Sequence, residues 1–288
     1  MKASGKSFKN MIARKKIAIQ GVRGAFHEIA ARHYHVQPID IVPAITFNDL
    51  IIESQRNDGG VIAIENSIAG TLVQNFPLIR NSSLDITGEI YLRIKHNLMA
   101  IPGQNLAEID RVYSHPMAIA QCRPFFTQYP HIRLVEAEDT ALSARIIFES
   151  KEKRVGAIAS SMAAEMYELE VLSAGIETNK QNYTRFLSLE RKDKKRDEST
   201  FEKISVCFEL THKIGSLHEV LKLLADKEAN LTKIQSFPII GDRWNYMFYL
   251  DFVLLEPNSF DTTILALQRM ITDLRILGRY NTGIHYED

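Results

Sequence analysis

The sequence has only two cysteines and no long apolar run, which argues against a disulfide scaffold and a membrane span. Its two cysteines, Cys122 and Cys207, lie far apart and form no metal-ligand spacing, which is typical of reduced thiols in a cytoplasmic protein. No apolar run approaches the roughly 18 residues that a membrane span needs. The first sixteen residues carry six Lys or Arg and no acid, yet they lack the apolar region of a secretory signal. We therefore expect residues 1–15 to be a disordered basic start, with an organelle transit peptide as the alternative.

The net charge is zero, and several common catalytic motifs are absent. The 35 basic residues offset 35 acidic ones, so no overall field attracts nucleic acid or an anionic membrane, and any anion selectivity must be local. The sequence has no paired acids placed for glycoside hydrolysis, no His-Glu-x-x-His for zinc and no Gly-x-x-x-x-Gly-Lys loop for phosphate. The segment from Gly21 to Gly24 is too short for a dinucleotide fingerprint. These absences predict a protein without a metal ion or a cofactor.

From Lys16 onward, short β-branched runs alternate with amphipathic stretches, which predicts an α/β fold of parallel sheets covered by helices. Strands this short and apolar are typical of burial on both faces of a sheet. The expected strands are 16–20, 39–42, 61–64, 97–101, 111–113, 132–135, 155–159 and 186–189, and the expected helices are 26–34, 47–55, 72–80, 117–128, 140–148 and 162–167.

The pattern changes after residues 191–200 (RKDKKRDEST), which carry no aliphatic or aromatic side chain and are interpreted as a solvated linker. Beyond it we expect strand 201–211, helix 215–229, strands 231–240 and 244–254, helix 262–274 and a short strand near 276–280. This βαββαβ order is ferredoxin-like. Because an open four-stranded sheet has free edges and often pairs with a copy of itself, a homo-oligomer is expected.

Small polar residues follow four of the predicted strands where a helix begins. Helix N-termini present unpaired N–H donors and a partial positive charge to anions. A single Ser or Asn there is usually only a helix cap, but caps need no Glu-Asn-Ser triplet and no additional Gln. Together, the segments that follow these four strands (strand exits) predict a cleft for a small polar anion. They are 21–26, 65–71, 114–116 with Gln121, and 160–161.

A fifth site lies at the start of the predicted strand 186–189, where Thr184 and Arg185 follow the polar run 179–183. This order can place a hydroxyl donor beside a fixed cation. The alternative for Thr184 is a turn residue. The alternative for Arg185 is a surface ion pair that adds little stability.

Taken in order, these segments resemble the prephenate dehydratase family. GVRGAF (21–26) is similar to the family's Gly-Pro-x-Gly-Thr-Phe, ENSIAG (65–70) to its Glu-Asn-Ser-x-Glu-Gly, and SHPMAIAQC (114–122) to its Ser-His-Pro-Gln-Ala-Leu-Ala-Gln-Cys. The run NYTRF (182–186) contains its Thr-Arg-Phe signature, and the C-terminal unit resembles the ACT regulatory domain. The resemblance covers nearly everything from Lys16 onward.

The resemblance implies a two-lobed catalytic domain over 16–190, shaped like a type II periplasmic binding protein. Lobe 1 would comprise about 16–94 plus 178–190 and lobe 2 about 95–177, with crossings near 93–97 and 175–179, followed by an ACT domain over 201–288. It also implies the reaction, in which prephenate loses water and carbon dioxide to give phenylpyruvate on the route to phenylalanine. The partners implied are prephenate, L-phenylalanine and further copies of the chain, as a homodimer or homotetramer.

Thr184 is the expected catalytic residue, because the reaction must deliver a proton or a strong hydrogen bond to the departing hydroxyl. A neutral pocket with few cations favours the loss of the carboxylate charge. Three positions depart from the family pattern, namely Met117, Ala69 and His27, so arogenate stays open as a substrate. The expected substrate-binding residues are Glu65, Asn66, Ser67, Ser114, Gln121, Ser160 and Arg185.

In the ACT domains of this family, phenylalanine binds between paired domains at a Gly-Ala-Leu and a Glu-Ser-Arg-Pro segment. The second segment reads QSFP (235–238) here and has lost both charges. The alternative to phenylalanine feedback is therefore a dimerisation domain whose ligand site has drifted, with Phe237 filling it. The expected phenylalanine-binding residues are Gly215, Ser216, Leu217, His218, Asn230, Leu231, Gln235 and Ser236.

A non-catalytic binding protein or amino-acid sensor is the competing class, since both folds serve that purpose. A secreted binding protein needs a signal peptide, and a sensor needs an output module that sixteen N-terminal residues cannot hold. The same short segment argues against a fused chorismate mutase, so a monofunctional enzyme is expected.

Overall fold

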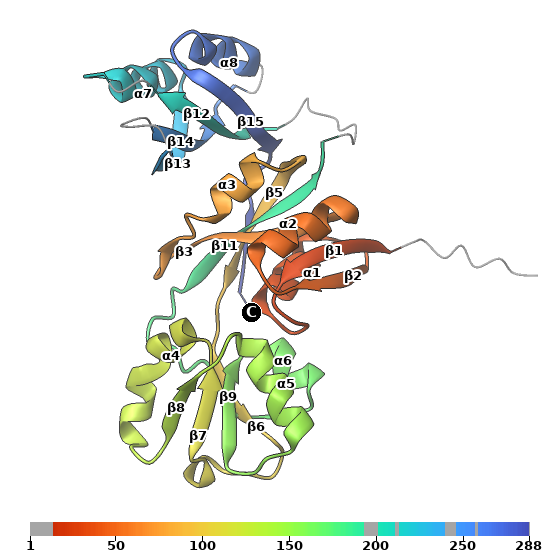
Figure 1. Ribbon diagram of the computed structural model, residues 1–288. Helices are drawn as coiled ribbons and strands as arrows, with labels where there is room; N and C mark the ends of the chain where they lie inside the picture. Colours follow the sequence, from red (N-terminus) through yellow and green to blue (C-terminus); the bar gives the residue numbers. More distant parts are fainter. Residues whose placement is uncertain (1–13, 193–200, 211–212, 240–245, 257–258, 288) are drawn as a thin grey trace, which may run out of the picture.

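The computed structural model describes residues 14–192, 201–210, 213–239, 246–256 and 259–287. Two lobes and a C-terminal domain follow one another along the molecule, with lobe 1 in the middle (Figure 1). The class is α/β, as predicted. The predicted linker 191–200 lies almost wholly outside the described residues.

Lobe 1 is a mixed sheet in the order β5-β11-β3-β1-β2. Strand β1 runs parallel to β2 and β3, but β11 is antiparallel to both β3 and β5, so the all-parallel prediction is wrong for these pairs. The reason is that β11 returns from the other lobe rather than through a crossover helix. The elements are β1 (Lys15–Gln20), α1 (Phe26–Tyr34), β2 (Ile39–Ala44), α2 (Phe47–Arg56), β3 (Gly59–Asn66), β4 (Gly70–Thr71), α3 (Asn75–Arg80), β5 (Leu84–Arg93) and β11 (Tyr183–Arg191).

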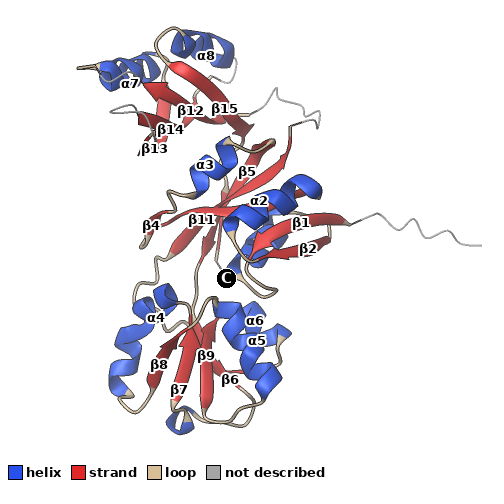
Figure 2. Cartoon of the chain, viewed as in Figure 1, coloured by secondary structure: helices blue, strands red, loops and turns tan. Residues whose placement is uncertain are grey.

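Lobe 2 has a five-stranded sheet in the order β10-β6-β9-β7-β8, with α4 at one flank and α5 and α6 at the other (Figure 2). Strand β9 is buried along its whole length, as its apolar sequence predicts. The helix predicted over 117–128 ends at Cys122, because Pro124 cannot continue the α-helical hydrogen bonds. The elements are β6 (Asn97–Ala100), η1 (Leu106–Glu108), β7 (Arg111–Ser114), α4 (Pro116–Cys122), η2 (Arg123–Gln128), β8 (Arg133–Glu136), α5 (Thr140–Ser150), β9 (Val155–Ala159), α6 (Ser161–Met166) and β10 (Glu170–Ser173).

The chain passes between the lobes twice, from β5 to β6 and from β10 to β11. The two passages are tied to each other beside His96, whose backbone N–H donates to Glu177 Oε2 (2.9 Å) and whose carbonyl accepts from Ile176 N (2.8 Å). The backbone N–H of Ile94 donates to the carbonyl of Asn182 (2.7 Å). These bonds define the hinge about which the cavity between the lobes is built.

The C-terminal domain is a βαββαβ unit with the sheet order β13-β14-β12-β15, which confirms the ferredoxin-like prediction. Its second helix ends at Gln268 and not at Leu274, because the last strand begins at Thr272. The elements are β12 (Lys203–Leu210), α7 (Ser216–Asp226), β13 (Ala229–Pro238), β14 (Tyr246–Leu254), α8 (Phe260–Gln268), β15 (Thr272–Tyr280) and the terminal β16 (Ile284–Tyr286).

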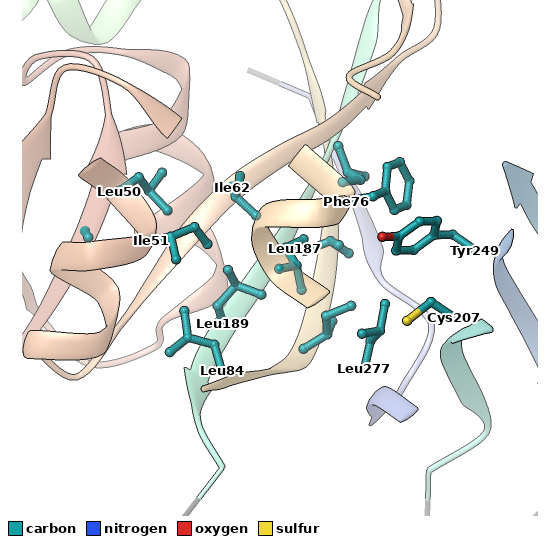
Figure 3. Close-up of a cluster of buried hydrophobic side chains, with 14 of the residues drawn as sticks. Leu50, Ile51, Ile62, Phe76, Leu84, Leu187, Leu189, Cys207, Tyr249 and Leu277 are labelled. Carbon is teal, nitrogen blue, oxygen red and sulfur yellow. The ribbon is translucent and has the colours of Figure 1, made fainter. Parts of the chain in front are cut away.

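The C-terminal domain shares both a sheet and a core with lobe 1. Strand β15 meets β5 at Gly278 and Ile86, where a Cβ on the glycine would lie 2.2 Å from the Ile86 carbonyl oxygen. The terminal strand β16 then pairs with β5 in parallel and brings the C-terminus to the junction of the lobes (Figure 1). Figure 3 shows the shared core, in which Tyr249 and Cys207 pack near Phe76 of α3.

Among the described residues, no helix combines the length and the apolar character that a bilayer-spanning segment requires.

Candidate active site

A cavity of 400 Å³ lies between the two lobes. The first turns of four helices contribute to its wall, namely α1, α2, α4 and α5. Their N–H groups supply partial positive charge, and the described lining contains no Lys or Arg. The cavity is lined by Gln20, Ala25, Phe26, His27, Phe47, Ala63, Asn66, Ala69, Leu72, Gln74, Ile94, His96, His115, Met117, Ala118, Gln121, Glu138, Asp139, Thr140, Thr184 and Phe186.

Thr184 lies in the wall of this cavity on β11, next to Asn66 at the end of β3. The Asn66 Nδ2 atom donates to Thr184 Oγ1 over 3.0 Å. Because the hydroxyl oxygen accepts this bond, the hydroxyl hydrogen is available to a molecule in the cavity. The Asn66 Oδ1 atom accepts from the backbone N–H groups of Ile68 and Ala69, which fixes the orientation of the amide.

A chain of amide hydrogen bonds runs from Thr184 across the hinge into lobe 2. The second hydrogen of Asn66 Nδ2 is donated to Asn182 Oδ1 (2.8 Å), and Asn182 Nδ2 donates to Gln121 Oε1 (2.8 Å). The same Gln121 oxygen lies 2.9 Å from His96 Nε2. Since that oxygen can only accept, the His96 nitrogen is the donor, and both hydrogens of the Gln121 amide remain for the cavity. The chain thus holds donors from both lobes in one fixed arrangement.

Four of the expected substrate ligands have structural partners instead and do not line the cavity. Ser67 Oγ donates to Gln181 O, Ser114 Oγ to Ile158 O, and Ser160 Oγ to Gly24 O while it also caps α6. Glu65 forms an ion pair with Lys233 of the C-terminal domain at 2.6 Å. These side chains cap a helix or connect neighbouring segments and domains, so their polar groups are used within the protein.

Arg185 faces away from the cavity, contrary to the expectation that it holds a substrate carboxylate. Successive side chains on a strand point to opposite faces, so Arg185 emerges on the side opposite Thr184. It is 4 % exposed and is bonded to Glu89, Asp251 and Tyr280 at the interface with the C-terminal domain.

Two histidines of the cavity received no role from the sequence. His27 is buried against Phe47 and Phe186, and its Nε2 accepts from the Ala63 N–H at 3.3 Å. Burial lowers its pKa to about 3, so the ring is neutral. Burial also lowers the pKa of His96, against the opposing effect of its bond to Gln121. A lone histidine near an apolar run has no sequence feature that indicates such a role. The Asn182 amide, by contrast, lies in the NYTRF run beside Thr184, which is a signal for a site residue.

Glu138 and Asp139 are the carboxylates of the described lining. Asp139 caps α5 by accepting from the Leu142 N–H at 2.8 Å. Burial raises the pKa of Asp139, while its bonds to the backbone N–H groups of α5 act in the opposite direction. No group of three metal-ligating side chains occurs in the part of the chain that the structure describes.

The segments expected to bind phenylalanine all belong to the C-terminal domain. Gly215, at φ +85°, precedes α7, and α7 packs beside β13, with Leu217 and Leu231 in one core cluster. Phe237 does not occupy this region, because its ring packs on Phe76 of lobe 1 and on Tyr249. The alternative in which Phe237 fills the ligand site therefore disagrees with the structure.

The fold is a two-lobed α/β architecture with a cavity between the lobes, and the described lining of that cavity has no cationic side chain. A family model described as prephenate dehydratase matches residues 17–194. The chain belongs to the prephenate dehydratase family, which confirms the predicted family and, with it, the predicted decarboxylating dehydration of prephenate.

Relatives and solved structures named as dehydratases support the same assignment, and one similar structure has another name. A prephenate dehydratase of Methanocaldococcus jannaschii is 38 % identical over 80 % of this chain and 84 % of its own, and arogenate dehydratase 2 of Petunia hybrida is 34 % identical over 93 % and 72 %. The Arthrobacter aurescens prephenate dehydratase in complex with L-Phe has a TM-score of 0.81 at 27 % identity, covering 92 % of this chain and 89 % of its own. The structure described as GqqA, a quorum-quenching acylase, has a TM-score of 0.85 at 29 % identity, covering 93 % and 98 %.

Proposed function

We propose that the interlobe cavity binds prephenate and that Thr184 donates a hydrogen bond to its departing ring hydroxyl. In the reaction the bond from the ring to the carboxylate carbon breaks, and its electrons enter the ring. The bond from the ring to the hydroxyl then releases hydroxide, which leaves as water once protonated. The observation that carries the proposal is the bond from Asn66 Nδ2 to Thr184 Oγ1 in a cavity whose described lining has no cationic side chain.

The charge distribution suits both departures. A hydroxyl that accepts one hydrogen bond is a better donor of its own hydrogen, so Asn66 strengthens the contact from Thr184 to the leaving oxygen. A carboxylate that becomes carbon dioxide loses its charge, and a cation bound to it would oppose that loss. Helix N-termini and the Gln121 amide instead orient the anion with partial charges only.

Substitution of the hydroxyl tests this proposal. Thr184→Val should lower kcat by about 10²–10⁴ because the donor is lost, whereas Thr184→Ser should keep most of the activity. Phenylpyruvate formation from prephenate, followed by its absorbance, gives kcat and KM for both variants. Wild-type rates in Thr184→Val and Thr184→Ala would remove the hydroxyl from the mechanism.

Arogenate is a second candidate substrate, favoured by the carboxylates at one end of the cavity. Arogenate carries an ammonium where prephenate has a keto oxygen, and Asp139 or Glu138 can pair with an ammonium. The ratio of kcat/KM for the two substrates decides between them. If Asp139 recognises the ammonium, Asp139→Asn should lower kcat/KM for arogenate more than for prephenate, and equal losses would assign Asp139 to helix capping alone.

Acyl transfer is not favoured by the contacts of the cavity hydroxyl. A nucleophilic threonine needs a base that accepts its proton. The hydrogen-bond partner of Thr184 Oγ1 is instead a donor, Asn66 Nδ2, which directs the hydroxyl hydrogen away rather than removing it. The shared fold with the acylase therefore does not carry its activity to this cavity.

Feedback by L-phenylalanine is proposed for the C-terminal domain. The N-terminus of the 11-residue helix α7 can receive an amino-acid carboxylate, and Asn230, Gln235 and Ser236 on β13 offer polar side chains that a second copy could bring to such a ligand. Strand β13 is the last strand of its sheet in the described residues, so a second copy can pair at this edge and complete the site as a homodimer or homotetramer.

Thermal shift and inhibition assays with L-phenylalanine test the regulatory site, with D-phenylalanine as the ligand control. Asn230→Ala should weaken both responses, while Asn281→Ala, at an exposed residue of the same domain, should leave them unchanged. The absence of both responses in the wild type would favour a domain that serves dimerisation alone.

A further inference from the structure

Six buried polar side chains meet between lobe 1 and the C-terminal domain, directly behind the cavity. We call these residues the junction cluster, and each is at most 5 % exposed. Two belong to lobe 1 and four to the C-terminal domain, so the cluster exists only when the two parts are docked. Its members are Glu89, Arg185, Lys203, Ser205, Asp251 and Tyr280.

Every charge in the junction cluster has a partner. The Arg185 Nε atom donates to Glu89 Oε2 and its Nη1 to Asp251 Oδ2, both at 2.6 Å, and Nη2 donates to the Tyr280 hydroxyl at 3.2 Å. Lys203 Nζ donates to Glu89 Oε1 at 2.7 Å. Ser205 Oγ donates to Asp251 Oδ1 at 2.5 Å. Two cations and two anions thus balance in a buried space.

The carboxylates determine the protonation of the arginine. Burial alone would lower the pKa of Arg185, but Asp251, the Tyr280 hydroxyl and Glu89 together raise it well above its ordinary value. A planar guanidinium with several fixed partners has little freedom to move.

The position of Arg185 on β11 connects this cluster to the reaction. Thr184 and Arg185 are adjacent, and their side chains leave opposite faces of one strand. A shift of the C-terminal domain that moves Asp251 must pull on the Arg185 guanidinium and so on the backbone that carries Thr184. The Lys233–Glu65 ion pair crosses the same interface beside β11, because Glu65 on β3 is the register partner of Arg185. By contrast, the Arg80–Asp273 ion pair joins the end of α3 to β15, and neither residue belongs to β11.

We propose that Arg185 is a positioning residue for Thr184 and that its bond to Asp251 transmits the docking state of the C-terminal domain to the cavity. This inference rests on the proposed role of Thr184 and on regulation through the C-terminal domain. Ligand binding to that domain would change the rate by displacing the Thr184 hydroxyl, without a contact between ligand and substrate.

Asp251→Asn tests the proposal, because the amide keeps the size of the side chain but weakens the bond to Arg185. We expect kcat for prephenate to fall about 10- to 100-fold, as for a misplaced catalytic group, with KM within about twofold. The remaining activity should no longer respond to L-phenylalanine. Asp273→Asn is the matched control, since it makes the same change at the same interface, and its kcat, KM and response should equal those of the wild type.

A folded Asp251→Asn enzyme with the kcat and the response of the control would overturn the proposal. If Asp251→Asn does not fold, Tyr280→Phe decides, because it removes one hydroxyl that accepts from Arg185. We expect its kcat to fall about three- to tenfold at constant KM, and a kcat equal to that of Asp273→Asn would contradict the proposal. Full activity of Thr184→Val would refute the role of Thr184 itself, so the two failures are distinguishable.

Discussion

The two faces of strand β11 solve opposite electrostatic problems within one residue of each other. On the face that carries Thr184, the donors are neutral amides and helix N-termini, and the described lining of the cavity has no cation. On the face that carries Arg185, two cations and two anions are buried together. A site that must let a carboxylate lose its charge needs weak partial charges, whereas a junction between domains tolerates full charges because none of them is lost during the reaction.

The difference also explains why the two faces respond differently to substitution. An ion pair buried in protein is costly to desolvate, and removal of one partner leaves the other charge uncompensated. An amide chain carries no net charge, so its loss alters geometry and donor direction more than stability. We therefore expect damage to the Thr184 face to appear in rates and damage to the Arg185 face to appear in folding as well.

The largest expected effect is Asn66→Asp on the neutral face. The carboxylate keeps the two bonds from the backbone of the 66–69 turn but accepts the Thr184 hydrogen instead of donating to the hydroxyl. It also places a charge beside a dianionic substrate. We expect kcat to fall about 10²–10⁴-fold. The exposed Asn179→Asp, which also keeps its turn acceptor, is the control, and steady-state kinetics with equal losses in both variants would contradict the neutral-donor role.

The next effect is Glu89→Gln on the charged face. Glu89 accepts from Arg185, Lys203 and the Gly283 N–H, so its neutralisation leaves two cations with one anion. We expect the free energy of unfolding in urea to fall by about 3–5 kcal/mol. Glu53→Gln removes the exposed pair with Arg56 and should cost less than about 1 kcal/mol. Similar losses in the two variants would show that the junction cluster adds no stability.

Strand β5 is an element that the sequence pattern did not predict. The prediction omitted β5, although LDITGEIYLR alternates, and placed a domain crossing just after it. A charged side chain on a strand is normally taken to face solvent. Glu89 is instead buried, where it pairs with Lys203 of the C-terminal domain. The pattern can be interpreted only once the partner surface is known.

The predicted site residues fall into two groups, those that line the cavity and those that serve the structure. Thr184, Asn66 and Gln121 lie in the cavity wall and were predicted by the strand exits and the family motifs. Ser67, Ser114 and Ser160 occupy the same kind of exit but act as ties and caps, and a hydroxyl at a helix start has no sequence feature that separates the two roles. His96 became a cavity residue only through the hinge, which joins segments more than 80 positions apart.

The smallest expected effect concerns His27 on the neutral face and the change of stability with pH. Burial lowers the pKa of His27 to about 3 from 6.5 in the unfolded chain. Above pH 6.5, His27 is neutral in both the folded and the unfolded protein. Below pH 6.5, it binds a proton in the unfolded chain but stays neutral in the folded protein. The free energy of unfolding should therefore fall by about 1.4 kcal/mol per pH unit from this residue between pH 6.5 and about 3.

His27→Gln keeps an acceptor for the Ala63 N–H and removes this acid-sensitive contribution. Between pH 7 and pH 5 the variant should lose about 2 kcal/mol less stability than the wild type, measured by urea unfolding at both values. His131→Gln, at an exposed histidine, is the matched control and should follow the wild type. If His27→Gln showed the same acid sensitivity as the control, the pKa of His27 would not be lowered by folding, and the Thr184 face would carry a charge at pH 5.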